Sequence, residues 1–110
     1  MSLVFIVDQE EYEAVLGIMT DYNIQCGIVF TTSEWLSNMV EIHFPKICLE
    51  DEFDTTMVES FIRYQIDNDY RETGVIVLDD GVDDEYVEWM VKNLEFYNIV
   101  LIMTVPRPLL

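Results

Sequence analysis

Basic residues are scarce in this 110-residue sequence: five lysines and arginines stand against 22 aspartates and glutamates, for a formal net charge of -17. Proteins bind nucleic-acid phosphates through clustered Lys and Arg, and anionic membrane surfaces attract the same clusters. The composition therefore argues against direct nucleic-acid binding and against a membrane surface. A protein partner with a basic surface, a divalent cation, or solubility alone would account for the charge.

Long hydrophobic runs and a basic leader are also missing. No apolar run approaches the roughly 18 residues that span a bilayer, and no basic segment precedes the first apolar stretch. The two cysteines, Cys26 and Cys48, both fall in apolar segments, and we predict that they are reduced, buried thiols of an intracellular protein. An apolar fraction of 51% excludes disorder, so we expect a single domain over residues 1–110.

Short apolar runs alternate with segments of helical periodicity along the chain. We expect strands at residues 3–7, 26–30, 46–49, 74–78 and 99–104, and helices at 10–21, 33–41, 55–68 and 83–97. Such alternation predicts a three-layer α/β domain with a mainly parallel sheet of about five strands and helices on both faces. The pattern leaves open whether the last strand is parallel to the others.

Acidic side chains follow several of the predicted strands. Asp8, Asp51, Asp79 and Asp80 would all lie at the carboxyl edge of a parallel sheet, where ligands usually bind. Carboxylate oxygens suit Mg²⁺ and Ca²⁺, so these four residues are candidates for a weak divalent-metal site, or for the centre of a metal-dependent hydrolase. The competing interpretation is that they stabilise the positive ends of the helices that follow.

Several segments, taken in order, resemble the genome-packaging ATPases of large nucleocytoplasmic DNA viruses. They are residues 27–32, 44–54, 58–65, 75–80 and 98–104, followed by Pro106. In this resemblance the Val-Ile-Val-Leu-Asp-Asp segment ending at Asp80 is similar to the magnesium-binding strand, and residues 98–104 are similar to the sensor strand. The resemblance implies a P-loop ATPase-like fold, with Asp79 and Asp80 in the magnesium and water-activating positions. It also implies a virus-encoded protein, present in the host cytoplasm or in the virion.

The sequence departs from that family where phosphoryl transfer would need it most. The phosphate-binding loop would lie at residues 8–12, but Asp-Gln-Glu-Glu-Tyr contains neither glycine nor lysine, and its carboxylates would repel a triphosphate. The arginine expected before the last strand is absent from residues 94–97, and Val105 stands where a glutamine is expected. We therefore expect no enzymatic activity and no nucleotide cofactor, but a structural or regulatory module that acts through protein contacts.

Two alternatives belong to other classes. The order of elements also suits a response-regulator receiver domain with its phosphoacceptor near Asp51, although Gln9 replaces an expected acid and no lysine ends the last strand. The charge alone would suit an acidic DNA-mimic inhibitor that occupies a basic groove.

Large aromatic residues are the candidate anchors for a partner. Trp35, Trp89 and Tyr97 could fill pockets on another protein, as such residues do at the energetic centres of interfaces. For the two tryptophans, the mostly apolar helix faces on which they lie favour core packing instead. The partner is expected to be a protein with a basic surface, and the sequence does not decide between a monomer and a homo-oligomer.

Overall fold

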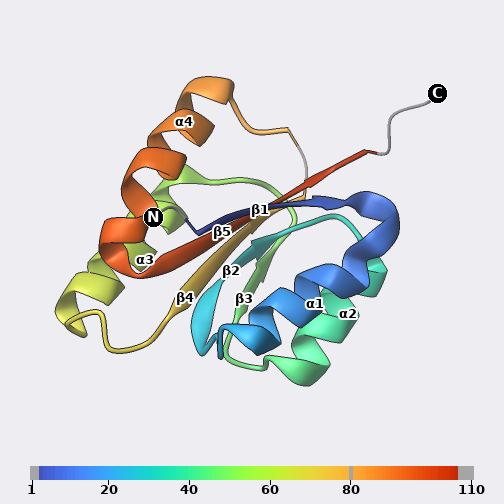
Figure 1. The fold of residues 1–110 in the computed structure, drawn as a ribbon, viewed down its shortest axis with the longest axis horizontal. Helices are drawn as coiled ribbons and strands as arrows, with labels where there is room; N and C mark the ends of the chain where they lie inside the picture. Colours follow the sequence, from blue (N-terminus) through green and yellow to red (C-terminus); the bar gives the residue numbers. More distant parts are fainter. Residues whose placement is uncertain (1–2, 80, 107–110) are drawn as a thin grey trace.

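The structure is a computed structural model that describes residues 3–79 and 81–106. Strands and helices alternate along the chain (Figure 1). In order they are β1 (Val4–Asp8), the 3₁₀ turn η1 (Gln9–Glu11), α1 (Tyr12–Asp21), β2 (Cys26–Phe30), α2 (Glu34–His43), β3 (Cys48–Glu50), α3 (Thr55–Asp67), β4 (Gly74–Leu78), α4 (Asp84–Asn93), the 3₁₀ turn η2 (Leu94–Tyr97) and β5 (Ile99–Val105). None of these helices is long and apolar enough to cross a bilayer.

All five strands belong to one sheet, in the order β1-β5-β4-β2-β3. Every neighbouring pair is parallel, including the last strand, β5, which pairs with both β1 and β4. The predicted α/β architecture with a parallel sheet is therefore confirmed. The order also contradicts the receiver-domain alternative, because β1 lies at an edge here, whereas flavodoxin-like receiver sheets have their first strand inside the sheet.

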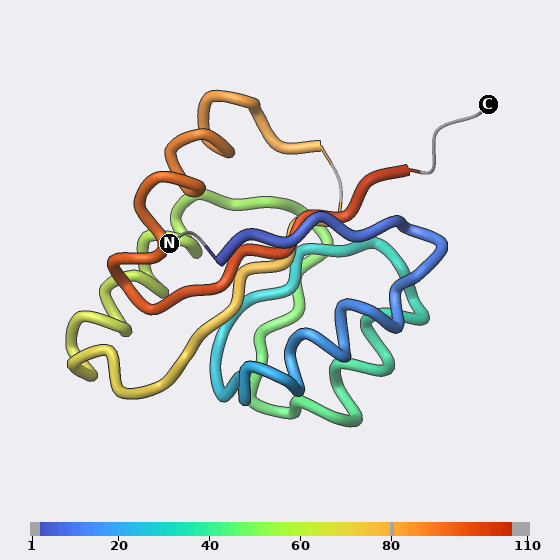
Figure 2. The backbone as a smooth tube through the Cα atoms, viewed as in Figure 1, coloured from blue at the N-terminus to red at the C-terminus, as the bar shows by residue number. Residues whose placement is uncertain are grey.

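Helices cover both faces of the sheet, as predicted. On one face α1 and α2 contribute Val15, Met19, Leu36 and Val40 to an apolar core, while α3, α4 and η2 build the core of the other face. Figures 1 and 2 show α1 and α2 together below the sheet and α3 and α4 on its other side. Strands β2 and β4 lie inside the sheet, and all their residues are buried, which explains their continuous apolar sequences.

Strands β2 and β4 also approach each other closely at Gly27. This residue has a φ of 149°, and a Cβ atom added to it would lie 2.2 Å from the carbonyl oxygen of Val75. A larger residue would force the two strands apart, so the centre of the sheet depends on glycine at this position.

The edge strand β3 departs from the sequence-based prediction. It begins at Cys48, not at residue 46, and Cys48 is exposed, while Cys26 in β2 is buried. The prediction of a buried Cys48 was therefore wrong. Its apolar neighbours resembled those of an interior strand, but a strand at the sheet edge has one side without a neighbour.

Candidate functional site

Three interior strands end in polar residues that meet at the carboxyl edge of the sheet. Asp79 directly follows β4, Thr31 directly follows β2, and Thr104 lies near the end of β5. The backbone N–H of Asp79 donates to the carbonyl oxygen of Phe30 at 3.0 Å, which extends the pairing of β4 and β2 by one residue. Parallel pairing of neighbouring strands thus places an aspartate between two threonines.

The carboxylate of Asp79 is almost completely enclosed, with 2% of the residue exposed. Its Oδ1 accepts hydrogen bonds from the Tyr12 hydroxyl at 2.7 Å and from the Thr104 hydroxyl at 2.5 Å, and its Oδ2 accepts one from the Thr31 hydroxyl. Burying a carboxylate is unfavourable unless such donors replace water, and hydrogen bonds to a charged acceptor are stronger than neutral ones. The three hydroxyls therefore provide the polar surroundings that this side chain needs.

The backbone of Asp79 is held by the turn that follows β1. The side-chain amide of Gln9 donates to the Asp79 carbonyl oxygen at 2.7 Å and lies 3.4 Å from the hydroxyl oxygen of Thr104. The Thr104 hydroxyl is also 3.0 Å from the same carbonyl oxygen. These contacts fix the beginning of the β1–α1 connection against the ends of β4 and β5.

The β1–α1 connection is the place where a P-loop protein would bind phosphate. Here it is the 3₁₀ turn η1, and the Asp8 side chain accepts a hydrogen bond from the backbone N–H of Glu10 at 3.0 Å. Tyr12 then begins α1, reaches Asp79 with its hydroxyl and stacks against Trp35, with ring centroids 6.3 Å apart. At least one N–H of the turn thus binds a carboxylate of the protein itself.

A cavity of about 390 Å³ opens beside Asp79, next to the beginning of α4. Its lining residues come from the ends of β4 and β5 and from the connections around them: Gln9, Leu78, Asp79, Gly81, Val82, Val87, Met103, Thr104, Val105 and Pro106. The lining contains no positively charged side chain among the described residues. Among the described residues, the cavity therefore offers mainly apolar contacts and no cationic side chain to pair with an anion.

Three of the four aspartates proposed from the sequence, Asp8, Asp51 and Asp79, are described, and they do not share one position. Asp8 binds its own turn, Asp79 is enclosed by hydroxyls, and Asp51 is exposed beyond β3, at the opposite edge of the sheet from β1. Within residues 3–79 and 81–106, no three or more His, Cys, Asp or Glu residues are grouped to hold a metal ion. Asp80 lies outside the described residues, so the weak metal site stays a prediction.

The candidate anchors lie on different faces of the molecule. Trp35 on α2 is 43% exposed and Trp89 on α4 is 40% exposed, so the prediction that both pack in the core was wrong. Tyr97 is half-buried and contacts Tyr70 at a ring-centroid distance of 6.5 Å. Because α2 and α4 cover opposite faces of the sheet, one partner surface cannot easily contact both tryptophans (Figure 1).

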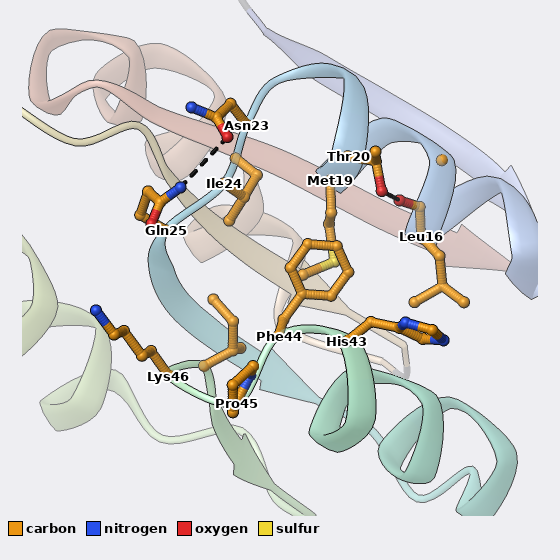
Figure 3. Close-up of a pocket in the computed structure, with 12 residues that line it drawn as sticks. Leu16, Met19, Thr20, Asn23, Ile24, Gln25, His43, Phe44, Pro45 and Lys46 are labelled. Carbon is orange, nitrogen blue, oxygen red and sulfur yellow. Dashed lines mark hydrogen bonds between the residues drawn. The ribbon is translucent and has the colours of Figure 1, made fainter.

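A larger cavity, of about 650 Å³, lies away from Asp79, between the ends of α1 and α2. Figure 3 shows Phe44 near its centre, with the side chains of His43 and Lys46 on either side and Met19 behind. The residues that line it lie at the amino ends of the strands, before β2 and β3 begin, whereas Asp79 lies at the carboxyl ends. It is therefore separate from the polar cluster around Asp79.

The polar cluster contains residues that the sequence did not single out. The helical pattern assigns Tyr12 to an apolar helix face, and neither Thr31 nor Gln9 was expected to contact Asp79. A signal was present for Thr31, because it is the first polar residue after an uninterrupted apolar strand, as Asp79 is.

Comparison with known proteins shows the fold. No protein-family model and no curated protein matches the chain. Among solved structures it is similar to the genome packaging NTPase B204 from Sulfolobus turreted icosahedral virus 2, determined in complex with AMPPCP. The TM-score is 0.51 at 13% sequence identity, and the match covers 96% of this chain and 65% of that chain. The present chain thus has a similar α/β arrangement and spans about two thirds of the length of that protein.

Proposed function

We propose that this chain is a viral protein with a packaging-NTPase fold that binds no nucleotide and acts as a structural or regulatory module through protein contacts. The likeness to a viral genome packaging NTPase supports the first part of this proposal. The observation that carries the second part is the β1–α1 turn, which is occupied by the Asp8 carboxylate and packed onto Asp79 through Gln9 and Tyr12.

The composition and hydrogen bonding of the β1–α1 turn disfavour phosphate binding. P-loop proteins hold phosphates with backbone N–H groups of a glycine-rich loop and with a lysine. Here residues 8–11 contain three acids, and the N–H of Glu10 already donates to Asp8. A triphosphate would have to displace that carboxylate and then approach the remaining acidic side chains. Their repulsion opposes the attraction that a helix N-terminus has for anions.

The hydrogen bonds of the Asp79 carboxylate also disfavour magnesium binding. Both of its carboxylate oxygens accept hydrogen bonds from hydroxyl groups of Tyr12, Thr31 and Thr104. Each hydrogen bond to a charged group contributes about 1.5 to 3 kcal/mol. A metal ion that took over these oxygens would have to offset the bonds it displaced, so we expect divalent binding to be weak.

The charge of the chain supports the proposed role in protein contact. A net charge of -17 favours partners with a basic surface and makes their association weaker at high salt. If the chain is viral, such a partner would be met in the host cytoplasm or in the virion. A pull-down from the native source should then recover a basic protein at low salt and lose it at high salt.

Calorimetry with Mg-ATP tests the absence of a nucleotide site. We expect no heat of binding at submillimolar nucleotide for the wild type or for the matched variant Asp79→Asn. Nucleotide binding with a dissociation constant below about 100 µM, or about -5.5 kcal/mol, would overturn the proposal if Asp79→Asn abolished that binding. Binding that persisted unchanged in Asp79→Asn would also overturn it, and would place the nucleotide away from the β4 end.

A further inference from the structure

In the part of the chain that the structure describes, no strand pairs with the outer edge of β1. Among the described residues β1 pairs with β5 alone, and the N–H of Leu101 donates to the carbonyl oxygen of Leu3 at 2.9 Å. In a parallel pair, alternate residues direct both backbone groups to the neighbour. Since Leu3 faces β5, the backbone N–H and C=O groups of Val4 and Ile6 point to the open edge.

The side chains at this edge are apolar. Ile6 is 67% exposed, and its partner in the register, Met103 of β5, is half-buried on the same face. Met103 and Val105, both in β5, also line the cavity of about 390 Å³ beside Asp79. An apolar strip thus runs from Ile6 across β5 into a groove.

Edge strands are normally protected from further pairing. Common devices are a charge or proline within the strand, a very short strand, or a covering segment. The other edge strand, β3, has three residues, but β1 has five, and its first four, Val-Phe-Ile-Val, carry no charge. With four uncharged residues and an exposed isoleucine, the edge of β1 therefore has little protection against pairing with a further strand.

We propose that β1 takes up an extended segment of another protein as an additional strand. Apolar side chains of that segment cover Ile6, and a lysine or arginine of the same segment faces the acidic end of β1. This inference rests on the proposed protein-contact function and names its surface. The carboxylates of Asp8, Glu10 and Glu11 at that end supply the complementary charge.

Charge also decides between another protein and a second copy of this chain. Two copies paired along β1 would bring together two molecules of net charge -17, with their acidic β1–α1 turns close to the same interface. A basic segment meets the same apolar edge without this repulsion and gains attraction from the turn. A heterologous strand is therefore the occupant that the surface fits.

A peptide of sequence KKVTVIVKK, with capped ends, is a suitable probe because it offers an apolar strand with lysines at either end. We expect saturable binding, with NMR amide shifts concentrated in β1 and β5, that weakens as salt is raised. Two control peptides carry N-methyl groups on alternate residues, one on the odd and one on the even positions. Both keep the charge of the probe, and one of them lacks the N–H groups that face β1. At least one of these methylated peptides should bind about tenfold more weakly.

Two matched variants locate the contact. Ile6→Lys places a repelling charge on the edge and should reduce binding at least about tenfold, while Ile42→Lys on α2 should leave it unchanged. The control is well matched, because Ile42 is 68% exposed and lies on the other face of the sheet. Circular dichroism of both variants checks that they are folded.

Three results would overturn the inference. Binding that is insensitive to both N-methylated peptides would mean attraction by charge without strand addition. Equal losses in Ile6→Lys and Ile42→Lys would show that the site is elsewhere. A dimer of the wild type in sedimentation, broken by Ile6→Lys, would identify a second copy as the occupant. None of these outcomes depends on Mg-ATP, so this inference and the absence of a nucleotide site fail separately.

Discussion

Replacing Thr104 with valine tests whether the hydroxyl cluster stabilises the Asp79 carboxylate. Thr104→Val keeps the shape of the side chain but removes the hydroxyl that lies 2.5 Å from Oδ1 of Asp79. Since Asp79 is 2% exposed, water cannot easily replace the lost donor. A hydrogen bond to a buried charge contributes about 1.5 to 3 kcal/mol, so we expect the free energy of unfolding to fall by about 2 kcal/mol.

Urea unfolding followed by circular dichroism measures this loss. The transition midpoint should fall while the slope stays constant, because the substitution changes little of the surface exposed on unfolding. Thr20→Val is the matched control: its hydroxyl donates to the carbonyl oxygen of Leu16 on the exposed side of α1, and its loss should change stability by less than about 0.5 kcal/mol.

A double-mutant cycle with Asp79→Asn separates charge from packing. In the Asp79→Asn background the hydroxyl of Thr104 faces a neutral amide, so Thr104→Val should lower stability by about half as much as in the wild type. An equal loss in both backgrounds would contradict this prediction, since the hydroxyl of Thr104 would then be unrelated to the charge of Asp79. So would a loss below about 0.5 kcal/mol in the wild type.

Four further predictions concern the glycines, the two cysteines and divalent ions. Gly27→Ala should destabilise the protein by more than about 2 kcal/mol, because the added Cβ would lie 2.2 Å from a carbonyl oxygen of β4. Gly17→Ala, whose Cβ would lie in open space on α1, should stabilise the protein by up to about 1 kcal/mol. Urea unfolding measures both changes. A maleimide at neutral pH should label exposed Cys48 but not Cys26 until the protein unfolds, which intact mass would detect. Burial raises the pKa of Cys26 from 9.0 to about 11, so the unfolded thiol loses its proton first, and stability should fall as pH rises between these values, less so in Cys26→Ala. If a weak metal site exists, MgCl₂ or CaCl₂ should raise the melting temperature more for the wild type than for Asp79→Asn, whereas equal shifts would indicate general screening.

The architecture could be predicted because its signals are local. The apolar run of β4 and the start of α3 coincide with the predicted bounds, since strand and helix periodicities differ clearly. Bounds were less accurate where the backbone changes type without a change of pattern. The predicted helix to residue 97 is divided into α4 and the 3₁₀ turn η2, and the helix predicted from residue 10 begins with the turn η1.

The site was harder to predict because it depends on strand order. The position of Asp79 at a strand end follows from the sequence alone, but its neighbours depend on which strands lie beside β4. Periodicity does not show that β5 lies between β1 and β4, which is what separates Asp8 from Asp79 and brings Thr104 beside it. The contact from Tyr12 likewise needs the direction in which α1 leaves its turn, which no residue pattern specifies.

The pairing of β1 with β5 also determines when the sheet can be completed during synthesis. Within the described residues, β1 has no other strand partner, and Asp8 is paired in register with Val105. At 5 to 20 residues per second, a ribosome needs roughly 5 to 20 s to advance from β1 to β5. Strands β2, β3 and β4, which pair with one another, are synthesised in that interval, before the apolar β1 can pair with β5. The exposure of β1 to chaperones, and to other nascent strands, is therefore set by the speed of translation.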